Sequence, residues 1–214
     1  MEDVVPFASR AYGELFILLF IARGMDFFST WVATPNLLLE GNPIARKLGW
    51  RWGIPLNCAL CVGFAFWPIP AIVISTTSVL VAARNFQSAW LMRSLGEHLY
   101  REWHVERVQE TSVTLYLFCL FAQTLLVAGV GAAVIFFTDK VREPILLAIG
   151  LGIIGYAAAV LFYTLLGVWR LRRADLAKSR FERSFTFDMA PSTPQRNGKV
   201  VVMAASQDLR ANGK

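Results

Sequence analysis

Long stretches of the chain contain no charged residue. Neither Asp, Glu, Lys nor Arg occurs in three windows, 52–83, 111–138 and 144–169. The hydrocarbon core of a bilayer is about 30 Å thick and takes roughly 20 apolar residues per helix, so each window is long enough to cross it. The first window has room for two crossings, and Pro68 and Pro70 divide it because proline interrupts a helix.

These windows, together with a further apolar stretch near the N-terminus, predict an all-α protein, a polytopic transmembrane helix bundle of five spans. The spans cover about 12–34, 52–67, 71–92, 112–137 and 145–169. We expect residues 1–170 to form the transmembrane domain. Residues 171–214 are polar and basic and are expected to form a partly disordered cytoplasmic tail.

The composition agrees with a membrane protein. The chain is 56% hydrophobic and 17% charged, whereas about a quarter of the residues in an average soluble domain are charged. This excludes an ordinary soluble globular domain. The first span carries Arg23 and Asp26 and lacks the small residues of a signal-peptide cleavage site, so we expect it to remain as a span.

The Lys and Arg residues predict the orientation in the membrane. Sixteen of the 21 fall in the loops after the first and third spans or in the tail, whereas the opposite side holds three. Because loops rich in Lys and Arg stay in the cytoplasm, we expect the N-terminus outside, the C-terminus in the cytoplasm and a location in the cell inner membrane. The net charge of +6 follows from these loops and the tail, so it does not indicate nucleic-acid binding.

Two groups of polar residues lie inside predicted spans, at similar depth in the inner half of the bilayer. Arg23, Asp26 and Thr30 share one face of the first span, and Arg84 and Asn85 lie in the third. An ionised side chain near the bilayer centre costs about 2.5 to 3.5 kcal/mol, so it is retained only where something offsets that cost. Arg23 and Asp26 are three residues apart and can pair within one helix. If the two spans pack together, we expect Asp26 to meet Arg84 as well.

The segment after the first span contains Glu40, Asn42 and Pro43. Asn followed by Pro is a common helix start, with Asn42 as the N-cap and Pro43 at the first position, and Gly49 would end this short helix. A second, compatible interpretation is that Glu40 and Asn42 fold back beneath Asp26. They would then complete a polar pocket at the inner mouth of the bundle.

Asp26 and Thr30, followed by the Glu-Gly-Asn-Pro sequence at 40–43, resemble the signature of a family of small uncharacterised prokaryotic membrane proteins. In that family an aspartate and a hydroxyl residue in the first span precede a Glu-x-Asn-Pro turn. The resemblance covers residues 26–44 and leaves the long basic tail unexplained. It implies which residues matter and implies no particular reaction or ligand.

The sequence offers little for metal or covalent chemistry. Cys58 and Cys61 have the spacing of metal ligands but no neighbouring His or acid, and His98 and His104 point to different sides of one helix. The chain contains no Gly-x-Ser-x-Gly elbow, His-Glu-x-x-His sequence or phosphate-binding glycine loop. We therefore expect no metal ion, no cofactor and no catalytic residue.

The candidate binding residues are Arg23, Asp26, Thr30, Glu40, Asn42, Arg84 and Asn85. Two interpretations stay open: a buried ion pair that fixes helix packing, or a binding or transport site. We expect a non-enzymatic binding, accessory or assembly component that contacts membrane lipids, with another membrane protein or a second copy of the chain as further candidate partners. The alternatives are a small oligomeric transporter or channel that takes a proton or cation at Asp26, and a lipid-modifying membrane enzyme.

Overall fold

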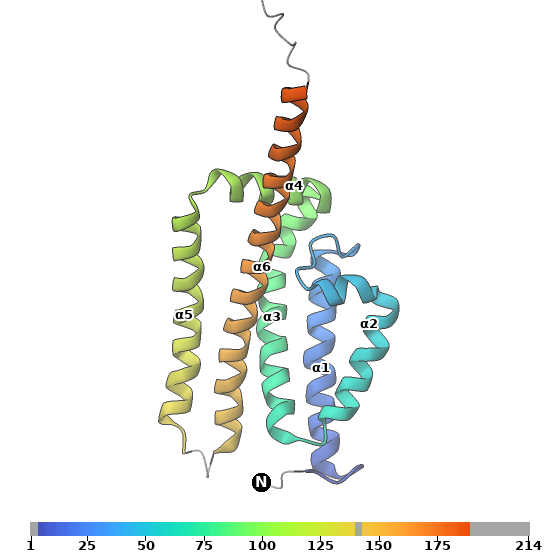
Figure 1. Ribbon diagram of the computed structural model, residues 1–214. Helices are drawn as coiled ribbons and strands as arrows, with labels where there is room; N and C mark the ends of the chain where they lie inside the picture. Colours follow the sequence, from blue (N-terminus) through green and yellow to red (C-terminus); the bar gives the residue numbers. More distant parts are fainter. Residues whose placement is uncertain (1–3, 140–142, 189–214) are drawn as a thin grey trace, which may run out of the picture. The chain divides into compact units, whose positions relative to one another are not determined.

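A computed structural model describes residues 4–139 and 143–188 of the chain, with side chains up to residue 173, and every regular element in these residues is an α-helix. The six helices of this part are α1 (Arg10–Ala33), α2 (Pro43–Phe64), α3 (Pro68–Leu95), α4 (Glu97–Glu110), α5 (Val113–Phe137) and α6 (Pro144–Asp188) (Figure 1). The chain divides into two compact units, Met1–Ala174 and Asp175–Lys214. The predicted all-α class is confirmed, whereas the disorder expected near the C-terminus falls mostly outside the described residues.

Four helices are long and apolar enough to cross a membrane. They are Arg10–Ala33, Pro68–Leu95, Val113–Phe137 and Pro144–Arg173. These helices coincide with the first, third, fourth and fifth predicted spans, so the protein has the architecture of a multi-pass helical membrane protein. The predicted second span, 52–67, falls on α2, which is not among the four, and the count of five stays a prediction.

α2 begins and bends at the residues that the sequence indicates. The Asn42 side chain accepts a hydrogen bond from the backbone N–H of Ile44, and Pro43 occupies the first helical position. Gly49 has a φ of 62° and a ψ of −171°, a conformation that is natural for glycine and strained for other residues. This bend separates the polar first turns of α2 from its apolar remainder.

α1 and α3 run parallel and pack closely (Figure 1). Arg23 of α1 hydrogen-bonds to Ser78 of α3, and Thr30 accepts a hydrogen bond from Asn85, so the residue numbers rise together along both helices. Most of the side chains buried on the two helices are small, and small side chains let helix backbones approach closely. They include Ala22, Ser29, Ala33, Ala71, Ser75, Ser78, Ala82 and Ala89.

α2 runs back along α1 in the opposite direction. The Tyr12 hydroxyl donates to the carbonyl of Val62 at 3.1 Å, and the indole N–H of Trp50 donates to the carbonyl of Pro35 at 2.8 Å. The numbers fall along α2 as they rise along α1, which defines an antiparallel pair. α3 then begins at Pro68, where the sequence predicts the break between two helices.

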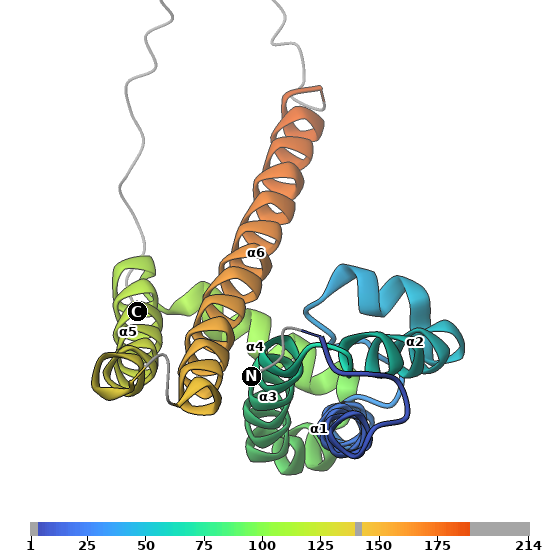
Figure 2. The same cartoon turned by 90° about the horizontal axis from the view of Figure 1, so that it is seen from below.

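α6 lies between α3 and α5 in both views (Figures 1 and 2). Gly152 of α6 lies against Thr76 of α3, and the Thr77 hydroxyl donates to the Gly152 carbonyl at 3.0 Å. On the other side of α6, a Cβ atom at Gly150 would lie 2.9 Å from the carbonyl oxygen of Gly131 in α5. Glycine therefore allows α6 to approach both neighbours. α4 connects α3 to α5, and most of its side chains are exposed.

Candidate functional site

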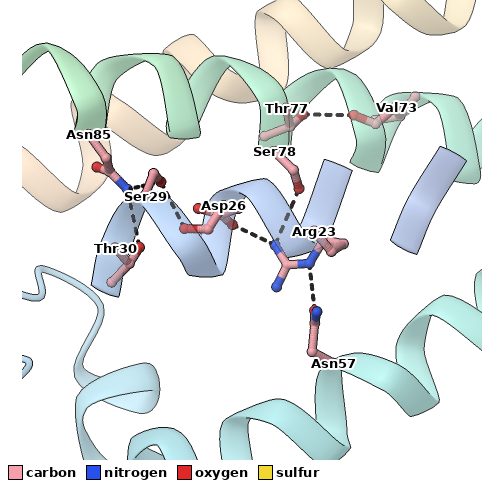
Figure 3. A network of polar contacts seen from close by, with 9 residues as sticks. All are labelled: Arg23, Asp26, Ser29, Thr30, Asn57, Val73, Thr77, Ser78 and Asn85. Atoms are coloured by element: carbon pink, nitrogen blue, oxygen red, sulfur yellow. Dashed lines mark hydrogen bonds and ion pairs between the residues drawn. The ribbon is translucent and has the colours of Figure 1, made fainter. Parts of the chain in front are cut away.

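Arg23 joins three helices through its guanidinium group (Figure 3). Its Nε donates to Oδ1 of Asn57 in α2 at 2.6 Å. Its Nη1 donates to Oδ2 of Asp26 at 2.9 Å and to Oγ of Ser78 in α3 at 3.3 Å. The expected pair between Arg23 and Asp26 is therefore formed within α1, at the i,i+3 spacing that brings side chains together on a helix.

A second polar cluster follows one to two turns further along α1. Nδ2 of Asn85 donates to Oγ of Ser29 and to Oγ1 of Thr30, both at 3.2 Å. The Ser29 hydroxyl donates in turn to the backbone carbonyl of Asp26 at 2.8 Å (Figure 3). This bond connects the cluster to the Arg23 network, which consists of Arg23, Asp26, Asn57 and Ser78. Thr30 and Asn85, both among the predicted site residues, therefore contact each other beside Arg23 and Asp26 and link α1 to α3.

Arg84 does not join this group. The expected contact with Asp26 is not formed, and the Arg84 side chain makes no hydrogen bond or ion pair within the part of the chain that the structure describes. Successive residues on a helix are about 100° apart, so Arg84 points away from the face that Ser78 and Asn85 share. It shares a face with Thr77, which hydrogen-bonds to α6.

Glu40 and Asn42 occupy the loop and helix start that follow α1. Oε1 of Glu40 accepts a hydrogen bond from the backbone N–H of Asn42 at 2.8 Å, and the Asn42 side chain caps α2. Both contacts lie within the loop and the helix start, and they give Asn42 the role of a helix cap. The polar pocket of Glu40 and Asn42 beneath Asp26 stays a prediction.

The Arg23 network retains unused hydrogen-bonding capacity. Nη2 of Arg23, Oδ1 of Asp26 and Nδ2 of Asn57 have no hydrogen-bond partner among the described residues. The side chains of Arg23 and Asp26 are 25% and 16% exposed. Because a guanidinium has five N–H donors and a carboxylate has two acceptor oxygens, the network can take up a further polar group.

A cavity of about 220 Å³ lies beside the network, among α1, α2 and α3. Leu19 precedes Arg23 by one helical turn, so the cavity extends from Arg23 toward the N-terminal end of α1. Apart from Arg23 its lining is apolar, since a free cysteine behaves as a small hydrophobic side chain. The lining residues are Leu19, Arg23, Leu60, Cys61, Phe64 and Ile74.

The sequence reasoning missed Asn57 and Ser78 as members of the site. Asn57 is the one amide side chain in the apolar part of α2, and that isolation is the signal that points to it. Ser78 lies seven residues before Asn85, a spacing that places both on one face of a helix. The same spacing relates Thr77 to Arg84, which lie on a different face of α3.

The geometry of the described site is suited to binding. The Ser78 hydroxyl accepts a hydrogen bond from Arg23, and the Asp26 carboxylate is already paired with the same guanidinium. Within residues 4–139 and 143–173, no group of three or more His, Cys, Asp or Glu side chains is arranged to hold a metal ion. The described residues thus provide hydrogen-bond donors and one acceptor beside an apolar space.

No family model, curated protein or solved structure matches the chain. The resemblance of residues 26–44 to small prokaryotic membrane proteins therefore stays a prediction.

Proposed function

We propose that this protein is a non-enzymatic binding component of the cell inner membrane, whose ligand places a polar group against the Arg23 network. The observation that carries the proposal is an incompletely used ion pair at the edge of a cavity. Ionisable residues inside a membrane are functional candidates by default, because their insertion is costly.

The alternative of a purely structural ion pair is less well supported by the geometry. A pair that only fixes helix packing would be enclosed and fully hydrogen-bonded, since each unsatisfied buried polar group costs about 1 to 3 kcal/mol. Arg23 and Asp26 are partly exposed, and each keeps an unused polar atom. These features favour a site that is completed by a ligand.

The proposal includes five crossings, with the N-terminus outside and the C-terminus in the cytoplasm. α1 and α3 run parallel and are both long enough to cross the bilayer, so the chain between them must return across it. α2 lies between them in the sequence and runs antiparallel along α1, which supports its role as the return crossing. Lys and Arg are concentrated in the loop after the first span, in the loop after the third span and in the tail. This distribution supports the orientation.

The binding function is tested by identifying what the protein carries out of its native membrane. Wild-type protein is compared with the site variant Arg23→Met/Asp26→Asn. The matched control is Arg10→Met/Glu14→Gln, which removes an exposed 2.9 Å ion pair from the same helix. Bound small molecules are identified by mass spectrometry after mild detergent extraction. We expect one near-stoichiometric molecule with wild type and control, and at least tenfold less with the site variant.

Size-exclusion chromatography and thermal unfolding establish whether the site variant folds. A second variant, Ile74→Phe, reduces the cavity from the α3 side and leaves the ion pair in place. It is expected to lose the same molecule. If all four proteins carry the same molecules in the same amounts, the proposed function is wrong.

A further inference from the structure

The cavity beside Arg23 is large and apolar enough to hold the apolar body of a small molecule. Its volume of about 220 Å³ exceeds that of an enclosed apolar cavity of about 150 Å³ that binds benzene, and it is open on one side. Water in such a space needs two to four polar partners, and the lining supplies one polar side chain, that of Arg23. The lining therefore favours a hydrocarbon chain or ring over water.

The polar end of the cavity favours an uncharged group that accepts hydrogen bonds. The unused donor in the lining is the Nη2 group of Arg23. The charge of Arg23 is already balanced by Asp26. An anionic ligand would add uncompensated negative charge, and burying an unpaired charge is far more costly than burying a neutral polar group.

The cavity borders the lipid. Leu60 of α2 lines the cavity and is 42% exposed. When the helices are embedded in a membrane, an exposed side chain at this position faces the lipid. Toward the N-terminal end of α1, the space is followed by a packed hydrophobic cluster that includes Tyr12 and Phe66, whose ring centroids are 5.0 Å apart. The ligand would therefore enter sideways from the membrane, which requires that it dissolve in lipid.

We propose that the cavity binds an uncharged lipophilic molecule whose carbonyl or hydroxyl oxygen accepts a hydrogen bond from Arg23. The hydrocarbon part of this molecule lies among Leu19, Phe64 and Ile74. This inference rests on the proposed binding function and adds the chemical class of the ligand and its route of entry.

Benzophenone is a suitable probe, because it is a neutral aromatic ketone that inserts into nearby C–H bonds under ultraviolet light. The full-length protein is placed in phosphatidylcholine nanodiscs and irradiated with benzophenone, and the adducts are located by peptide mass spectrometry. We expect adducts concentrated on the α1 and α2 residues of the cavity. A parallel reaction uses the anionic analogue 4-benzoylbenzoate, which is expected to label these residues at least tenfold less.

Variants connect the labelling to the cavity. Leu60→Trp fills the entrance, and its matched control, Leu125→Trp, makes the same change on the exposed surface of α5. We expect the first to reduce cavity labelling at least tenfold and the second to leave it unchanged. Ile74→Phe is a second cavity variant in case Leu60→Trp does not fold. Arg23→Met is expected to reduce labelling about tenfold, since it removes the charged donor.

Three results would overturn the inference: labelling spread evenly over lipid-facing residues, labelling unaffected by the cavity variants, or stronger labelling by the anionic analogue. Its failure is distinguishable from failure of the proposed function. If the cavity is not labelled but a charged molecule is lost from the Arg23→Met/Asp26→Asn variant, the protein binds a ligand of another class. If neither occurs, both proposals are wrong.

Discussion

The Arg23 guanidinium donates hydrogen bonds to one side chain on each of three helices, while Asp26 balances its charge. Inside a bilayer no water is present to replace these bonds, so each of them must come from the protein. If one of these side chains is removed, its former hydrogen-bond partner therefore finds no replacement. The coupling between Arg23 and Asp26 should be measurable in the free energy of unfolding.

Arg23→Met is expected to lower the free energy of unfolding by about 3 kcal/mol, because Asp26 loses its counter-ion and must either hold an unpaired charge away from water or take up a proton. The double variant Arg23→Met/Asp26→Asn should lose less, since neither charge is left unpaired. Equilibrium unfolding in mixed micelles measures both. An equal or larger loss in the double variant would show that the ion pair is not the source of the effect. Arg10→Met, on the exposed surface of α1, serves as the control with no measurable change expected.

Arg84 should behave in the opposite way. It lies half-buried on a helix long enough to cross the membrane and has no hydrogen-bond or ion-pair partner among the described residues. Arg84→Met is therefore expected to leave the free energy of unfolding unchanged or to raise it, by up to about 3 kcal/mol, because an arginine near the bilayer centre is costly. The same unfolding assay tests this. A clear loss of stability would reveal a partner for Arg84.

α3 packs against neighbours on two sides. Ser78 and Asn85 face α1, whereas Thr76 and Thr77 contact α6. The contact with α6 depends on Gly152, where a Cβ atom would lie 2.7 Å from Cβ of Thr76. Real Cβ atoms do not approach so closely, so any side chain at this position must push the two helices apart.

Gly152→Ala is expected to lower the free energy of unfolding by about 1 to 3 kcal/mol through overpacking between α3 and α6. Gly155→Ala is the matched control on the same helix, because its Cβ would lie 3.6 Å from Oγ1 of Thr77, an ordinary contact distance. Thermal unfolding of the two variants provides the comparison. Equal unfolding temperatures would contradict the close packing of α6 on α3.

Several helix boundaries could be predicted because local chemistry determines them. Pro68 begins α3, Asn42 and Pro43 begin α2, and Gly49 introduces its bend, each through backbone preferences that do not depend on the rest of the fold. The five-span count depends on α2, whose apolar part is short. Its crossing is supported by its antiparallel path along α1, which no local signal in the sequence conveys.

The site could be predicted only where its members share one helix. Arg23 and Asp26 are three residues apart, so their pairing follows from helix geometry alone. Asn57 and Ser78 join them from other helices, and their positions depend on how α2 and α3 are rotated. The rotation of a helix about its axis cannot be inferred from its sequence when nearly every side of the helix is apolar. In α3 the difficulty is different, because two packed faces both carry polar residues.

On the scale of the whole molecule, the parallel arrangement of α1 and α3 has the largest effect on topology. It places the loop after α3 on the same side of the membrane as the loop after α1, provided that α2 crosses. In the alternative arrangement only α1, α3, α5 and α6 cross, and α2 stays on one side of the membrane. For the same position of the N-terminus, the loops after α3 and after α5 would then both lie on the opposite side. The two arrangements therefore make opposite predictions for these loops.

Single cysteines at positions 47 and 102, introduced as Lys47→Cys and Glu102→Cys, distinguish the two arrangements, because the apolar part of α2 and the whole of α3 lie between them. Both positions are exposed, and the native residues Cys58, Cys61 and Cys119 are first replaced by alanine. If α2 crosses, both positions lie on the same side, and a membrane-impermeant maleimide is expected to label both only after permeabilisation. Labelling of one position but not the other in intact cells would show that α2 does not cross.

The spacing of Arg23 and Asp26 also has a consequence for biosynthesis. The two charges lie three residues apart on α1, at 2.9 Å from each other, so the first helix carries its own counter-ion as it leaves the ribosome. α1 can therefore partition into lipid as a neutral segment before α2 and α3 have been translated. If the aspartate came from a later helix, the Arg23 guanidinium would have no counter-ion at the translocon until that helix had been translated.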